Sequence, residues 1–178
     1  HSMWKEAHAT AFTVANCAKL DVLRDLQMGI RTMLKEGKSE QWFVRTLEPV
    51  LRAKGWWGPR DEVNPRTGEV ITVQQGSQWR LGLIARQNVQ NAVNAGRWQE
   101  QWENREDQPW LRYVSLNDAR TRPDHRALHG KVFPLEDPFW QTHYPPNGWN
   151  CRCYVQGVSE ARLKRRGWKV ERSEGKII

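Results

Sequence analysis

Five side chains of the kinds that bind metal ions gather in the last third of the sequence. They are His125, His129, His143, Cys151 and Cys153. Zinc accepts imidazole nitrogen and thiolate sulfur in tetrahedral sites, and a bound ion would fix a stretch with little regular structure of its own. In a strand, residues two apart point to the same face, so Cys151 and Cys153 could share an ion. We therefore take His125, His143, Cys151 and Cys153 as candidate zinc ligands.

Other interpretations of these residues stay open. Buried cysteines are more commonly small apolar side chains, and the histidines would then be hydrogen-bonded anchors of a loop. The Cys-x-Cys spacing also differs from the two-residue spacing of zinc knuckles. A disulfide between Cys151 and Cys153 would be strained. The pattern permits zinc without establishing it.

A charged cluster precedes the cysteines and permits two functions. Asp118, Arg120, Arg122 and His125 could form a catalytic site with His125 as general base. They could also form a latch, in which arginines pair with carboxylates and carbonyls to hold residues 118–133 against a sheet. The sequence offers no evident nucleophile, phosphate-binding glycine loop or carboxylate array. We favour the latch and a protein without enzymatic activity.

Aromatic and basic residues suggest contact with nucleic acid, with a structural alternative in each case. Phe139, Trp140, Tyr144 and Trp149 could stack on bases, although such residues more often form a small core under a long loop. After Gly157 the chain has seven basic and three acidic residues, and the formal net charge is +8. The adjacent residues Lys164, Arg165 and Arg166 could meet DNA phosphates, or they could belong to a solvated terminus.

The sequence predicts the helices and strands that must position these residues, and together they indicate an α+β fold. Apolar spacing indicates a helix over Trp4–Lys35, which Gly29 should divide or bend and which Gly37 should end. Ser39 should cap a second helix, which Pro49 should kink or shorten. We expect a helical region over residues 1–58 and a second domain over residues 59–178.

The second domain should contain a long helix and a small mixed sheet. A turn with short extended flanks is expected over Val63–Val73, and a helix over about residues 77–104 with Ser77 as cap. Residues 110–116 and 151–155 should be paired strands. Residues 117–150 should form a long loop rich in proline and tryptophan. A short basic helix should cover residues 159–166.

Composition restricts the partners and the redox compartment that we expect for this protein. No stretch approaches the roughly 20 apolar residues of a membrane helix, so we expect no membrane partner. Three cysteines, an odd number, argue against a secreted disulfide framework and favour a reducing compartment.

The central motifs resemble one known family. The runs D-x-R-T-R-P-x-H-x-x-L-x-G-K-V-F (118–133), D-P-F-W (137–140) and P-P-N-G-W-x-C-R-C (145–153) are similar to those of the phage Mu F-like minor head proteins, relatives of the phage head morphogenesis family. The resemblance covers most of the chain and is strongest over residues 110–157. Several motifs in the same order make a chance match improbable.

The resemblance implies a role in virion morphogenesis. Such a protein would be made in the host cytoplasm and then lie inside the capsid, next to portal or capsid protein and near double-stranded DNA that it helps deliver. Relatives in the broader family place cysteines near Arg122 and His125 and a histidine just before C-R-C. Here Arg122 and Gly148 cannot coordinate, which puts a full ligand set in doubt. The alternatives are a toxin-like or nucleotide-modifying enzyme and a sequence-tolerant nucleic-acid-binding module.

Overall fold

The computed structural model describes residues 12, 14, 17, 19–64 and 66–173. The chain divides into two compact units, residues 1–89 and residues 90–178. Helices together with small antiparallel sheets give the α+β fold that the sequence predicted. No helix in the described part of the chain is long and apolar enough to cross a membrane.

The first unit contains two consecutive helices, α2 (Leu20–Glu36) and α3 (Glu40–Ala53). Gly37 ends α2 with φ 63°, a left-handed conformation that glycine adopts without a side-chain clash. Ser39 caps α3, because its Oγ accepts a hydrogen bond of 3.2 Å from the backbone N–H of Trp42. Both predicted helix signals are confirmed.

Two other expectations for these helices are wrong: a division of the first helix at Gly29, and helical structure at residues 12, 14, 17 and 19. Helix α2 is not divided at Gly29, because a Cβ there would lie 2.9 Å from Leu47 Cδ1, so glycine allows close contact with α3. Pro49 lies inside α3, which continues to Ala53. Residues 12, 14, 17 and 19 are not helical, since Phe12, Val14 and Cys17 pack on the core in an irregular conformation. The rest of the expected helix before Leu20 lies outside the described residues.

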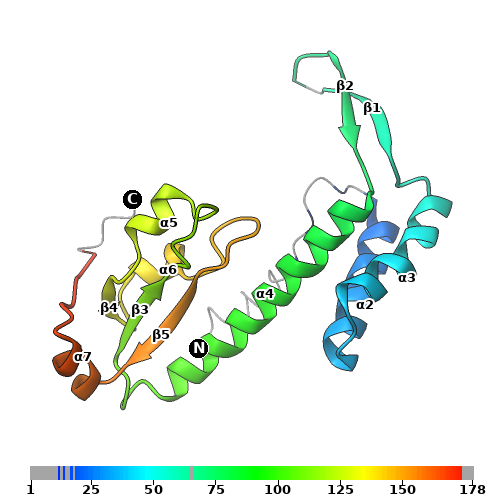
Figure 1. Cartoon of the computed structure of the whole chain (residues 1–178). Coiled ribbons are helices and arrows are strands. Elements are labelled where there is room, and N and C mark those ends of the chain that lie inside the picture. Colours follow the sequence, from blue (N-terminus) through cyan, green and yellow to red (C-terminus); the bar gives the residue numbers. More distant parts are fainter. Residues whose placement is uncertain (1–11, 13, 15–16, 18, 65, 174–178) are drawn as a thin grey trace. The chain divides into compact units, whose positions relative to one another are not determined.

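A hairpin of two strands extends from the helices of this unit (Figure 1). Strand β1 (Pro59–Val63) pairs antiparallel with β2 (Val70–Gln74), as the turn signals predicted. Almost every residue of both strands is exposed. The core therefore lies among the helices, and its members are Val22, Leu26, Ile30, Met33, Phe43, Leu47, Leu51, Trp56, Leu81, Ile84 and Ala85.

Helix α4 (Gln78–Glu103) contributes residues to both units. It begins where the sequence predicted, since Ser77 Oγ accepts a hydrogen bond of 3.1 Å from the backbone N–H of Arg80. Further along the same helix, Trp98 and Trp102 pack against the core of the second unit.

The second unit is built on a three-stranded antiparallel sheet (Figure 1). Strand β3 (Trp110–Val114) lies between β4 (Val132–Pro134) and β5 (Tyr154–Val158). In the β3–β5 pair Val114 is opposite Tyr154, so the predicted pairing of the two strand regions is confirmed. One isolated parallel bridge joins Val132 to Val170.

The segment expected to be mostly loop contains three short elements. These are helix α5 (Pro123–Ala127), strand β4 and helix α6 (Phe139–His143). Five-residue helices are too short to show a helical apolar period, which is why the sequence pattern missed them. The predicted basic helix is confirmed as α7 (Glu160–Arg166), which Ser159 caps.

Candidate metal centre

His125 is buried although it lies on a short surface helix. Its side chain is 6% exposed, whereas the residues beside it on α5 are exposed. The ring nitrogen Nε2 lies 3.7 Å from Asp124 Oδ2 and 3.4 Å from Arg122 Nη1. The other nitrogen, Nδ1, faces two thiols. The ring therefore has a charged side and a sulfur side.

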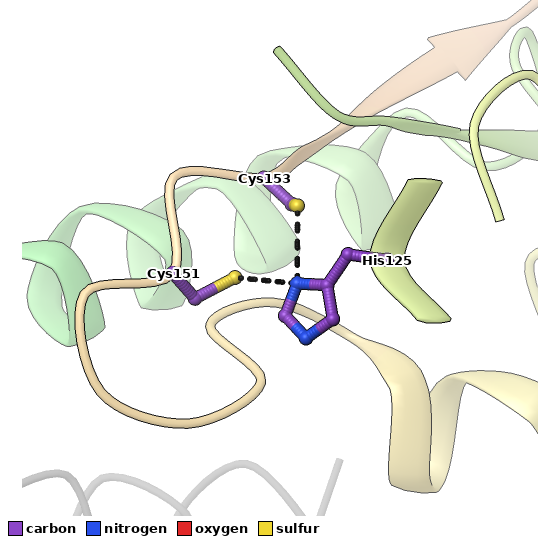
Figure 2. Close-up of side chains that lie close together, drawn as sticks. All are labelled: His125, Cys151 and Cys153. Atoms are coloured by element: carbon purple, nitrogen blue, oxygen red, sulfur yellow. Dashed lines mark hydrogen bonds between the residues drawn. The ribbon is translucent and has the colours of Figure 1, made fainter. Parts of the chain in front are cut away.

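Cys151 and Cys153 supply those thiols (Figure 2). Their Sγ atoms lie 3.6 Å and 3.4 Å from His125 Nδ1, and the three ligand atoms are all within 4.8 Å of one another. Both cysteines are buried. They precede β5 and are not in a strand as expected, so the loop conformation, and not strand alternation, turns both sulfurs toward the ring.

These separations match those in a tetrahedral zinc site. With Zn–S near 2.3 Å and Zn–N near 2.1 Å, a nitrogen and a sulfur bound to the same ion lie about 3.6 Å apart. No other group of three metal-binding side chains this close occurs among the described residues. The three atoms could hold a metal with little movement.

Burial and neighbouring charges act in opposite directions on the thiols. Burial raises the pKa of Cys153 to about 11, because the thiolate loses its hydration, while the positive charge of Arg122 lowers the pKa. The Tyr113 hydroxyl, next to Cys153, also has a raised pKa, with burial as the main cause. A cation among these groups would offset the cost of burying thiolate.

Tyr113 carries a buried polar atom that sequence reasoning overlooked. Its side chain is fully buried, and within the described part of the chain its hydroxyl makes no hydrogen bond of acceptable geometry. In β3, Tyr113 is opposite Val155, two residues after Cys153. Strand alternation would have indicated that Tyr113 is buried, but its position next to the thiols depends on the β3–β5 register.

The other two histidines are not brought into this group. His143 stacks on Phe139 with ring centroids 4.4 Å apart, and its Nδ1 is 2.7 Å from Thr142 Oγ1. His129 Nδ1 is 3.0 Å from the carbonyl oxygen of Ser115. Of the four candidate ligands, the structure brings together His125, Cys151 and Cys153.

The charged residues around α5 hold separate parts of the chain together. Arg152 donates two hydrogen bonds of 2.7 Å to the carboxylate of Asp118. This pairing lowers the pKa of Asp118 well below its usual range. Arg122 donates to the carbonyl oxygens of Asn147 and Trp149 at 2.9 Å and 2.5 Å. These contacts join residues 118–122 to residues 147–152, which is the kind of pairing that the latch interpretation expected, although the partner segment precedes β5.

The arrangement divides the predicted catalytic cluster. Arg122 lies beside His125, but the Asp118 carboxylate is paired with Arg152, and Arg120 is exposed on the segment between them. A pocket of about 640 Å³ borders His125, with His143 also in its wall. Space for a small molecule therefore exists next to the imidazole, although the four residues do not converge on it.

The aromatic run forms a core of its own. Trp140 is 3% exposed, and its indole N–H donates to the carbonyl oxygen of Pro134 at 2.9 Å. Phe139 stacks on Phe133, with ring centroids 4.1 Å apart. Tyr144 also packs against this core, whereas Trp149 is not among its residues. The buried members of this core are Leu111, Tyr113, Phe133, Leu135, Trp140, Cys151, Cys153 and Val155.

The basic residues of α7 are at the surface. Lys164, Arg165 and Arg166 are all exposed. Lys164 pairs with Glu160, one turn earlier, at 2.7 Å. The two arginines add positive charge to the end of the helix, where it is also favoured by the helix dipole.

The family follows from comparison with known proteins. The profile described as "Phage Mu protein F like protein" matches residues 24–156, which is most of the chain and includes α5 and both cysteines. The chain belongs to this family, as its motifs predicted.

Named relatives agree with this assignment. The chain is 43% identical over 173 residues to the Mu-like prophage FluMu F protein of Haemophilus influenzae, covering 97% of this chain and 41% of that protein. It is 43% identical over 165 residues to protein F of Escherichia phage Mu, whose name proposes a role in capsid assembly, covering 93% and 37%. An uncharacterised protein of Methanocaldococcus jannaschii is 35% identical over 123 residues, covering 68% and 18%.

The chain spans about two fifths of the length of the two phage relatives. No solved structure shows significant similarity to it.

Proposed function

We propose that this chain is a structural, non-enzymatic part of a phage head protein and acts in head assembly. The observation that carries the proposal is the match to the Mu F-like family over residues 24–156, together with 43% identity to the phage Mu protein named for capsid assembly. The contacts around α5 support it. The arginines of this region fasten the chain's own segments, which suits a protein that serves as a structural part of a larger assembly.

The partner that we propose is the portal or the inner face of the capsid, first in the host cytoplasm and then inside the virion. The β1–β2 hairpin is a candidate contact. Its apolar residues Val63, Val70 and Ile71 are 64%, 68% and 43% exposed. A two-stranded hairpin is marginally stable alone, and its edges can pair with a strand of another protein.

A chimera of the phage Mu relative tests this function. The segment of protein F that matches this chain would be replaced by this chain in a Mu lysogen, and heads would be counted by electron microscopy after induction. A control chimera would carry the matching segment of the Haemophilus relative. We expect DNA-filled heads that contain the chimeric protein, and fewer heads when Val63, Val70 and Ile71 are changed to Ser, Thr and Thr.

Two results would contradict the proposal. The first is normal head yield when the segment is deleted altogether. The second is a chimeric protein that is made and stable yet absent from purified heads and portals, while the control chimera is incorporated. Separate sedimentation with portal and with capsid protein would identify which of the two is the partner.

An enzymatic function is the second candidate, because the pocket beside His125 offers room for a small molecule. If the chain acts only structurally, the wild-type chain should catalyse no nucleotide-dependent reaction. A nucleotide-dependent reaction that the wild-type chain catalyses and the folded His125→Asn variant does not would favour the enzyme instead.

A further inference from the structure

We propose that His125, Cys151 and Cys153 bind one Zn²⁺ ion through Nδ1 and the two Sγ atoms, and that this ion is structural. It would tie α5 to the segment that leads into β5. The proposal does not depend on the head-assembly function, because it follows from the position of three side chains within the second unit.

The first argument is geometric. Three buried ligand atoms from two segments face one point, with Nδ1–Sγ separations of 3.4 Å and 3.6 Å. A zinc ion with ordinary bond lengths would place them about 3.6 Å apart. A hydrogen bond from Nδ1–H to sulfur gives similar distances, so zinc content distinguishes a metal site from this alternative.

The second argument is the set of groups around the ligands. With Nδ1 bound to the metal, Nε2 would carry the ring proton; Asp124 Oδ2 lies 3.7 Å from Nε2, slightly beyond hydrogen-bond distance, and Arg122 Nη1 lies 3.4 Å from it. The buried Tyr113 hydroxyl lies next to Cys153 and has no hydrogen-bond partner of acceptable geometry in the described structure. A metal-bound thiolate would accept its hydrogen bond.

The third argument is electrostatic. Two thiolates on Zn²⁺ leave no net charge at the centre, so the ion offsets part of the cost of burying them. The described residues supply three ligands, and the fourth position would be filled by water or by a group outside them.

A structural role fits the position of the site better than a catalytic one. All three ligands are at most 6% exposed, and neither cysteine borders the pocket beside His125. The ion would close a loop between residues 125 and 151 that contains only short elements. Because the unfolded chain does not hold this site together, binding of the ion would add its free energy to folding.

Native mass spectrometry of the whole purified chain tests the proposal. Wild-type protein from zinc-supplemented cells should carry one zinc ion per chain. The double variant Cys151→Ser, Cys153→Ser should carry none, whereas Cys17→Ser should keep the ion, because Cys17 lies in the first unit. Zinc retained by the double variant or absent from Cys17→Ser would show that the ion binds elsewhere.

A second experiment does not require the double variant to fold. Cobalt titrated into zinc-free wild-type protein should give thiolate-to-metal charge-transfer absorption and the strong visible bands of a tetrahedral site. Tyr113→Phe should weaken cobalt binding by about tenfold, as removal of an outer-shell hydrogen bond does. Unchanged affinity would remove Tyr113 from the site.

The wild-type protein by itself can overturn the proposal. It fails if the chain contains no zinc after supplementation and shows no cobalt bands. It fails equally if mass measurement after alkylation shows a disulfide between Cys151 and Cys153 in the protein as isolated from the cell.

Discussion

Arg152 holds the carboxylate of Asp118 with both of its terminal nitrogens, Nη1 at 2.7 Å from Oδ2 and Nη2 at 2.7 Å from Oδ1. Asp118 lies shortly before α5, and Arg152 lies between Cys151 and Cys153. The ion pair therefore joins these two segments of the chain. Arginine can make this paired contact because its guanidinium group is planar and forked, whereas lysine offers one point charge.

Arg152→Lys should therefore lower the stability of the second unit although charge is kept. The effect should be small, because both side chains are about two-fifths exposed and water screens the pair. Urea unfolding followed by Trp fluorescence measures it. Arg120→Lys, an exposed position in the same segment, is the matched control and should leave the midpoint unchanged. Equal midpoints for the two variants would contradict this role.

The same pair predicts a dependence on pH. The pKa of Asp118 is lower in the folded chain than the value of about 3.9 expected in the unfolded chain. The main cause is the hydrogen bonding from Arg152. A carboxyl whose pKa is lowered by folding stabilises the fold above its unfolded pKa, and this contribution disappears as pH falls. Wild type should thus exceed Asp118→Asn in stability near pH 6, and the difference should shrink as pH falls below about 4. A gap that widens on acidification would count against the assignment.

Arg122 should order the turn that precedes Cys151. It donates to the carbonyl oxygens of Asn147 and Trp149, so Arg122→Lys should leave at least one of them without a protein donor. We expect faster hydrogen exchange across residues 147–151 and little change in the β3–β5 ladder. Arg120→Lys again serves as control. Uniformly faster exchange throughout the unit would instead indicate global destabilisation.

Two helical glycines should respond oppositely to alanine. At Gly29 a Cβ would approach Leu47 Cδ1 and Phe43 Cε2 to 2.9 Å, so Gly29→Ala should destabilise the first unit by about 1–3 kcal/mol. At Gly96, an exposed position of α4, a Cβ would meet nothing within 4 Å, so Gly96→Ala should stabilise by about 0.5–1 kcal/mol. Thermal and urea unfolding measure both. The packing account fails if Gly29→Ala is neutral.

The exposed basic residues of α7 should govern DNA binding, if the chain contacts packaged DNA. Changing Lys164, Arg165 and Arg166 to Ala should weaken binding to double-stranded DNA regardless of sequence. The slope of log affinity against log salt should fall by about 0.9 for each phosphate that the variant no longer neutralises.

A control for this experiment removes the same charge elsewhere. Arg31, Lys35 and Lys38 are exposed basic residues in the last turns of α2 and just beyond it. Their triple change to Ala should leave the salt slope unchanged. If both triple variants lose affinity equally, the net charge of the chain determines binding, and α7 has no special role. If the wild-type chain does not bind DNA even at low salt, DNA contact is excluded.

Local signals were sufficient for much of the fold. Ser39 and Ser77 each cap a helix as expected, because a cap depends on residues three or four apart, and Ser159 caps α7 in the same way. Apolar alternation located β3, and strong motifs indicated the family. Such features depend on the chain's immediate neighbours, so the sequence alone determines them.

Gly29 shows the limit of local reasoning. Its low helix propensity predicts a break, but the contact with α3 favours a small residue at that point, and packing outweighed propensity. The short helix α5 was missed for a related reason, since five residues carry no periodic signal and the helix is held by contacts from distant segments.

Tertiary structure decided which residues make up the candidate metal centre. The sequence supplied four candidate ligands, and spacing could not choose between His125 and His143, because both lie within a few tens of residues of the cysteines. The selection came from α5 burying one imidazole against the sulfurs, while stacking on Phe139 held the other apart. Residue types fix which chemistry is possible, and long-range packing fixes which atoms meet, because the distance between two segments depends on all the contacts between them.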